Sequence, residues 1–180
     1  MIGLSSSQSK PTQEAPFAGP PWQRAAAFLV LALLAQTTVL HYFTFRNAEF
    51  SPVLVVVVWY AIATDSRRAI LFGLCAGFME DSVSGGTGGA WTAATTVTAF
   101  CTAMLSRSFF SDSIPLLAAI VVVATLLRNA LFWWVMEIQG YPTGLGYLHF
   151  HQTLWQSALN ALFITASVLF SRYVAKGARA

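Results

Sequence analysis

A glycine- and acid-containing pattern in the middle of the chain restricts its fold more than any other feature. Gly73, Gly77, Asp81, Gly85 and Gly89 recur at every fourth position, so a helix through them carries them on one ridge. The first two form a G-x-x-x-G pair in an apolar segment, the pattern that lets two membrane helices approach closely. The glycine run that follows ends the helix, because glycine stabilises helices poorly. The pattern predicts helix packing at Gly73 and Gly77 and a structural loop at Gly85 and Gly89.

Composition indicates that this ridge lies in a membrane. The 180 residues are 56% hydrophobic and only 9% charged, whereas about a quarter of the residues of a soluble domain are charged. We therefore expect an integral membrane protein with five or six crossings. The net charge of +3 is small and its basic residues are spread along the chain, so nothing indicates nucleic-acid binding. Cys75 and Cys101 lie in apolar segments and are expected to be small buried hydrophobic residues.

The apolar segments predict an all-α membrane protein, a compact bundle of six transmembrane helices. The expected crossings are residues 24–43, 52–64, 69–82, 91–105, 114–136 and 153–174. Residues 1–21, rich in Ser, Gln and Pro, are expected to form a disordered cytoplasmic tail, residues 22–175 the transmembrane domain, and residues 176–180 a cytoplasmic C-terminal end. The second and third segments are short and could form a re-entrant hairpin. Two full crossings are favoured, because a hairpin would place Arg67 and Arg68 near the middle of the bilayer.

The basic residues predict the orientation of the bundle. With both termini in the cytoplasm, eight basic residues lie inside and one, Arg46, lies outside. The eight are Lys10, Arg24, Arg67, Arg68, Arg107, Arg172, Lys176 and Arg179. In this orientation Trp91, Trp133, Trp134 and Trp155 fall near the outer interface, where amphipathic rings settle. Both signals favour a bundle with both termini in the cytoplasm.

Arg128 falls well inside an expected crossing, about 14 residues from its inner end, and needs a partner there. Asp81 is the favoured partner in a buried charge pair, and Glu80 is the alternate. The two acids are adjacent, so on a helix they point about 100° apart and only one can face the bundle fully. The competing interpretation is that Arg128 extends to lipid headgroups.

Amide side chains indicate a second polar group in the bundle. Gln152, Gln156 and Asn160 are spaced by four, and with Gln36 and Asn129 they could line one polar interior. Such residues join helices more often than they bind ligands. His149 and His151 would point the same way on an extended strand, but no cysteine or carboxylate is close in sequence, so no metal and no cofactor is expected. The chain also has no phosphate loop, nucleophile elbow or separated acid–base pair, and we expect no enzyme.

The ridge and the six-helix layout together resemble the MreD family of rod shape-determining proteins. The resemblance rests on Gly77, Asp81, Gly85 and Gly89 at four-residue spacing, on Pro52 at the start of the second segment, and on the polar turn Asp65-Ser-Arg-Arg68. It covers roughly residues 24–175.

The resemblance implies a non-enzymatic inner-membrane subunit of the cell-elongation machinery, which scaffolds or regulates peptidoglycan synthesis. The implied partners are membrane lipid, an MreC-like bitopic protein, the MreB filament and the pair of RodA with a penicillin-binding protein; a homo-oligomer stays open. The family's fold is similar to the substrate-binding components of energy-coupling-factor vitamin transporters, so a small-molecule transporter subunit is the alternative. Those components carry Ala-x-x-x-Ala on their first helix, and the alanines at 25, 26, 27, 32 and 35 include no pair spaced by four.

Overall fold

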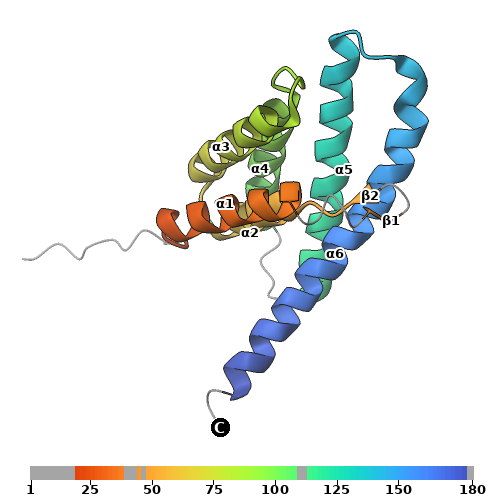
Figure 1. Ribbon diagram of the computed structural model, residues 1–180. Helices are drawn as coiled ribbons and strands as arrows, with labels where there is room; N and C mark the ends of the chain where they lie inside the picture. Colours follow the sequence, from red (N-terminus) through yellow and green to blue (C-terminus); the bar gives the residue numbers. More distant parts are fainter. Residues whose placement is uncertain (1–18, 39–43, 46–47, 109–112, 178–180) are drawn as a thin grey trace, which may run out of the picture.

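The computed structural model describes residues 19–38, 44–45, 48–108 and 113–177, and these contain six α-helices (Figure 1). They are α1 (Trp22–Thr38), α2 (Pro52–Ala63), α3 (Ser66–Ser84), α4 (Ala90–Ser108), α5 (Ile114–Ile138) and α6 (Gly146–Gly177), with the short 3-10 helix η2 (Thr143–Leu145) before α6. The prediction of an all-α fold is confirmed for this part of the chain. Residues 1–18 of the expected tail and residues 178–180 of the expected C-terminal end lie outside the described residues.

One small element was not expected. Strands β1 (Thr44–Phe45) and β2 (Ala48–Glu49) pair antiparallel, with Thr44 opposite Glu49 and Phe45 opposite Ala48. They lead the chain from α1 into α2. Two-residue strands show no alternation of polar and apolar residues, so no pattern could have predicted them.

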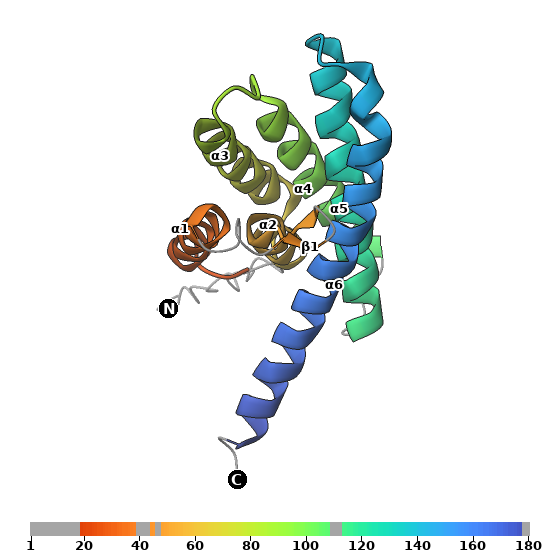
Figure 2. The same cartoon turned by 45° about the vertical axis from the view of Figure 1, so that its right-hand side comes forward.

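Helix α2 forms the centre of the bundle. Figure 2 shows it between α1, the α3–α4 pair and the α5–α6 pair. Eight of its 12 residues are buried. One of its faces packs with α1 and α3 through Val53, Val57 and Tyr60, and another packs with α5 and α6 through Leu54 and Val58. An all-round apolar helix is suited to this enclosed position.

Ser51 sets the start of α2. Its Oγ accepts a hydrogen bond from the backbone N–H of Leu54 at 3.4 Å, which satisfies one of the N–H groups that a helix start leaves unpaired. Pro52 occupies the first turn, where its missing N–H costs nothing. The central helix therefore begins at a fixed point, directly beside the polar interior of the bundle.

The glycine ridge brings α3 onto α4. A Cβ atom on Gly77 would lie 2.6 Å from the Cα of Thr92 and 2.6 Å from the carbonyl oxygen of Trp91. A Cβ on Gly73 would lie 2.7 Å from the Cβ of Ala99. Both distances are far below contact, so at these two positions only glycine allows the observed approach.

The loop that follows uses glycine for its backbone conformation. Gly85 is the C-cap of α3 with φ 59°, and Gly89 precedes α4 with φ 87°. Residues with a Cβ rarely adopt these positive angles. The structure thus places the first two glycines of the ridge at a helix contact and the last two in a turn.

Two of the described helices are long and apolar enough to cross a membrane by length and composition: α5 over Ile114–Ile138 and α6 over Gly146–Ser171. The expectation that six segments meet this standard is wrong. Helix α2 has 12 residues, which rise about 18 Å against a hydrocarbon core of about 30 Å. Charged residues interrupt the apolar character of α3, and threonines that of α4.

Candidate functional site

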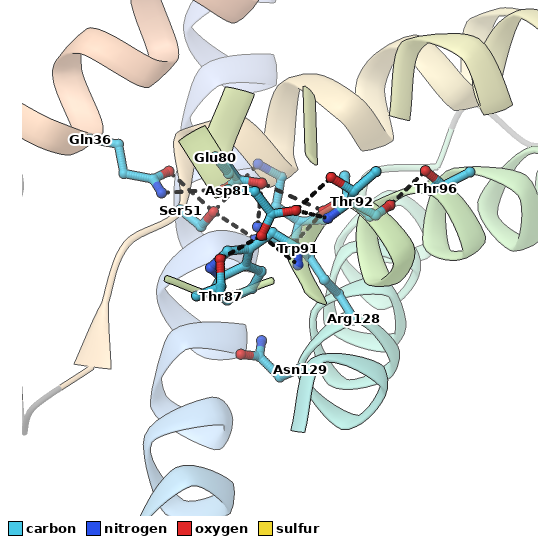
Figure 3. Close-up of polar contacts among 12 residues, drawn as sticks. Gln36, Ser51, Glu80, Asp81, Thr87, Trp91, Thr92, Thr96, Arg128 and Asn129 are labelled. Carbon is cyan, nitrogen blue, oxygen red and sulfur yellow. Dashed lines mark hydrogen bonds and ion pairs between the residues drawn. The ribbon is translucent and has the colours of Figure 1, made fainter. Parts of the chain in front are cut away.

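Arg128 lies at the middle of a buried polar cluster. It has the largest fully buried side chain of the described residues, and only 1% of the residue is exposed. Its Nη2 donates to Oε2 of Glu80 at 2.5 Å, its Nε donates to Oγ1 of Thr95 at 3.0 Å, and its Nη1 donates to Oγ of Ser51 at 3.1 Å (Figure 3). The Trp91 ring centroid lies 4.3 Å from Cζ of the guanidinium, a cation–π contact. One side chain of α5 therefore joins α2, α3 and α4.

The cluster closes into a ring through Gln36 on α1. The Gln36 Nε2 donates to Oε1 of Glu80 at 3.3 Å, and the hydroxyl of Ser51 donates to Oε1 of Gln36 at 3.3 Å. The hydroxyl of Thr95 lies 3.5 Å from Oε2 of Glu80. Both carboxylate oxygens of Glu80 thus accept hydrogen bonds, and each hydroxyl both accepts and donates. Five helices or helix starts, α1 to α5, meet in this ring.

The ring joins opposite charges in a dry setting. The side chains of Arg128 and Glu80 are 2% and 4% exposed. Charges so deeply buried persist only when paired and hydrogen-bonded. Because the pair is neutral overall and its polar atoms are satisfied, it suits a structural role in joining helices better than a reactive one.

The favoured pairing of Arg128 with Asp81 is wrong, and the alternate, Glu80, is the residue that pairs with it. The reason lies in the ridge. Asp81 continues the face that carries Gly73 and Gly77, and that face packs on α4. Its neighbour Glu80, about 100° further round the helix, points into the bundle and is 3% exposed.

Asp81 instead caps the N-terminus of α4 from outside that helix. Its Oδ1 accepts from the backbone N–H of Trp91 at 3.1 Å and from the hydroxyl of Thr87 at 2.5 Å. Its Oδ2 accepts from the backbone N–H of Thr92 at 2.8 Å and from the hydroxyl of the same residue at 2.5 Å. A carboxylate is favourable at this end, where N–H groups lack partners and the helix dipole is positive. Asp81 therefore locks the α3–α4 hairpin that the glycines bring together.

The predicted amide residues fall into two groups. Gln36 belongs to the ring around Arg128. The Nδ2 of Asn129 donates to Oε1 of Gln156 at 2.7 Å, and the Nδ2 of Asn160 donates to Oγ1 of Thr125 at 3.1 Å. The Oδ1 of Asn160 accepts the backbone N–H of Ser51 at 3.1 Å, which links the second group to the first. Helix α6 is thereby tied to α2 and α5.

Sequence reasoning missed Ser51 and Thr95, which are 2% and 0% exposed. Ser51 carries a signal that could have found it, since Ser before Pro at the start of an apolar run is a helix-start pattern. Thr95 carries none, because it is one of several threonines along α4.

No group of three metal-ligating side chains occurs among the described residues. His149 and His151 lie on α6 rather than on a strand, so their side chains point about 200° apart. The imidazole Nε2 of His149 lies 3.3 Å from the carbonyl oxygen of Asn129. The structure therefore separates the two histidines.

A bundle of helices with lipid-suited outer faces and a neutralised charge pair inside defines an α-helical membrane protein. Residues 21–174 match the family of the rod shape-determining protein MreD, and the chain belongs to that family. Membership gives it a role in rod shape determination and confirms the resemblance seen in the sequence. It does not support the alternative of a transporter subunit. Neither the curated proteins nor the solved structures contain a match to the chain.

Proposed function

We propose that this chain is a non-enzymatic subunit of the bacterial cell-elongation machinery that binds an MreC-like single-span protein and scaffolds peptidoglycan synthesis. One observation carries the proposal: the ring around Arg128 and Glu80 joins α1 to α5 and leaves its charges and hydroxyls satisfied. Such a ring fixes how the helices are placed relative to one another, which is the requirement of a docking platform. The MreB filament and the pair of RodA with a penicillin-binding protein are proposed to join through this assembly.

We further propose that the bundle is a multi-pass protein of the inner membrane with both termini in the cytoplasm. Large apolar side chains are exposed on every helix that surrounds α2, among them Leu31 on α1, Phe78 on α3, Met104 on α4, Trp134 on α5 and Phe170 on α6. Water disfavours so large an apolar surface, whereas lipid suits it. Helix α2 is enclosed by the other helices, so little of it faces the bilayer, and it does not need the length of a lipid-facing span. The eight-to-one distribution of basic residues supports the orientation.

Co-purification in mild detergent tests the proposed partner. The tagged chain is expected to recover a single-span protein with a periplasmic coiled coil. A variant with Arg128 changed to Ala is expected to recover less of it per mole of chain, because the platform loosens. Gly144→Ala, at an open position of η2, serves as the matched control. Recovery of an ATPase pair in place of the single-span protein would overturn the proposal in favour of a transporter.

A further inference from the structure

A cavity of about 320 Å³ opens beside the second polar group and shares Trp91 with the ring around Arg128. It lies where β2, the start of α4, the outer half of α5 and the first turns of α6 meet; Asn129, His149, Gln152, Gln156, Trp91 and Glu49 are among its lining residues. Ligand pockets in proteins hold about 300–1,000 Å³, so the cavity suits one small molecule. All of its described lining residues except Ala48 carry a side chain that can form hydrogen bonds.

The amide of Asn129 leaves an acceptor for this cavity. Its Nδ2 donates to the carbonyl oxygen of Thr125 at 2.9 Å and to Oε1 of Gln156 at 2.7 Å. The Nε2 of Gln156 donates to the carbonyl oxygen of Glu49 at 2.8 Å. Backbone carbonyls only accept, so both amides have one orientation. The Oδ1 of Asn129 then has no hydrogen-bond partner within the described residues, although this side chain is 4% exposed.

That oxygen is not fully enclosed by the packed protein. Among described side chains, the one fully enclosed polar atom without a partner is Oγ1 of Thr98. The unpartnered Oδ1 of Asn129 is therefore accessible, and the residue lines the cavity. An accessible but deeply set amide oxygen is a site for a donor on a bound molecule.

Other lining residues add unused groups of both kinds. The carbonyl oxygen that His149 Nε2 contacts only accepts, so a neutral ring carries its proton on Nε2 and keeps Nδ1 as an acceptor. The side-chain amide of Gln152 makes no hydrogen bond within the part of the chain described, and it offers both donors and an acceptor. The indole N–H of Trp91 is a further donor without a partner in those residues.

This mixture of donors and acceptors selects the ligand class. An anion would meet the carboxylate of Glu49, and none of the described lining residues is a lysine or arginine. An ammonium ion donates without accepting, so it would leave the Gln152 and Trp91 donors unused. Hydroxyl groups both donate and accept. We propose that the cavity is a binding site for a small neutral polyhydroxylated molecule of the sugar class, reached from the outer side of the bundle.

The proposal stands apart from the proposed partner, because none of its residues belongs to the ring around Arg128 except Trp91, and its test needs no partner. The purified full chain is studied in a detergent without a sugar headgroup, by saturation-transfer NMR of the free sugar. The probes are glucose and N-acetylglucosamine, with glucose 6-phosphate and ethylammonium as charged counterparts. Saturable binding of the neutral sugars, stronger than that of both charged probes, is expected.

Adjacent residues of α6 offer a matched pair of variants. Gln152 lines the cavity, whereas His151 is exposed and does not. Gln152→Ala is expected to weaken sugar binding roughly two- to tenfold, as loss of one hydrogen bond does. His151→Ala is expected to leave binding unchanged. Neither side chain makes a hydrogen bond to the described residues, so both variants should remain folded, which circular dichroism checks.

Three results would overturn the proposal: no saturable binding of either neutral sugar, equal or tighter binding of a charged probe, or equal weakening by the two variants. Co-purification of the single-span partner with the Gln152→Ala variant tests the sugar site separately from the proposed partner-binding function. Unchanged recovery of the partner together with weakened sugar binding is the result expected here. Loss of recovery would overturn the proposal, because the cavity would then receive a side chain of the partner.

Discussion

Arg128 on α5 and Glu80 on α3 form an ion pair whose Nη2–Oε2 distance is 2.5 Å and whose two side chains are almost fully enclosed. The pair lies 48 positions apart in sequence and joins the α3–α4 hairpin to the α5–α6 hairpin. Thr95, Ser51 and Gln36 complete the hydrogen bonding of both ends. A pair of this kind stabilises little compared with apolar packing, but breaking it strands a charge.

Removing one end of the pair is therefore expected to destabilise the bundle strongly. Glu80→Ala or Arg128→Ala should each lower the free energy of unfolding by about 3–5 kcal/mol, because the remaining charge is buried without a partner. The double variant should be no worse than either single variant. Thermal unfolding in detergent and abundance in cells measure the effect. Additive losses in the double-mutant cycle would show that the two residues act independently.

Asp81 provides the matched comparison for that cycle. It does not contact Arg128, so the coupling between Asp81→Ala and Arg128→Ala should be far smaller than that between Glu80→Ala and Arg128→Ala. A larger coupling for Asp81 than for Glu80 would contradict the observed pairing.

The cap on α4 predicts a separate effect of Asp81. Asp81→Asn leaves one acceptor oxygen, whereas the donors of Thr87, Trp91 and Thr92 use both carboxylate oxygens of Asp81. The change should therefore lower the free energy of unfolding by about 0.5–2 kcal/mol, as the loss of a helix cap does. Hydrogen exchange of the amides of Trp91 and Thr92 should become faster, since Asp81 accepts both. Asp65→Asn, which alters a half-exposed acid paired with Arg68, should leave those amides unchanged. Unaltered exchange of these two amides in Asp81→Asn would show that Asp81 does not cap α4.

Much of this fold can be predicted from local sequence patterns. The predictions that are wrong have a common physical cause. Segment lengths and apolar runs predict the helices, and the spacing of Gly73 and Gly77 predicts a close helix contact. The choice between Glu80 and Asp81 depends on how α3 is rotated about its axis, which is set by α4, a different segment. Sequence spacing shows that one acid faces inward without showing which. For the same reason Thr95 could not be singled out among the threonines of α4.

Of the described helices only α5 and α6 have the length and composition of a membrane span, and α2 shows that tertiary shielding can take the place of length. The apolar run 52–64 has the composition of a crossing, yet α2 is enclosed by other helices. Composition alone does not distinguish a helix that faces lipid from one that faces protein, because both environments exclude water.

The ridge predicts how strictly the α3–α4 contact needs glycine. Gly77→Ala adds a Cβ that would lie 2.6 Å from backbone atoms of α4. Backbone moves less readily than the end of a side chain, so a loss of about 1–3 kcal/mol is expected, as for other overpacked sites. Gly144→Ala meets nothing within 4 Å and should be neutral. Abundance and unfolding temperature in detergent distinguish the two, and equal stability of both variants would mean that the helices separate without cost.

The proposed orientation predicts which turns an impermeant thiol reagent reaches from outside. Both native cysteines, Cys75 and Cys101, are first changed to Ala. The expectation that they are buried is wrong, because Cys75 is exposed and Cys101 is partly exposed. Ser66→Cys lies at the start of α3, beside the basic residues that the positive-inside rule places in the cytoplasm. Gly144→Cys lies in η2, between α5 and α6, on the opposite side in the proposed topology.

In spheroplasts the reagent should label Gly144→Cys directly and Ser66→Cys only after the membrane is made permeable. Both positions are in turns or first helical turns, so a difference in labelling reports the side of the membrane rather than burial, and labelling of both in detergent is the control. Direct labelling of Ser66→Cys in sealed spheroplasts would place the α2–α3 turn outside and reverse the orientation. Most basic residues would then lie outside, contrary to the positive-inside rule, and the cavity would open toward the cytoplasm.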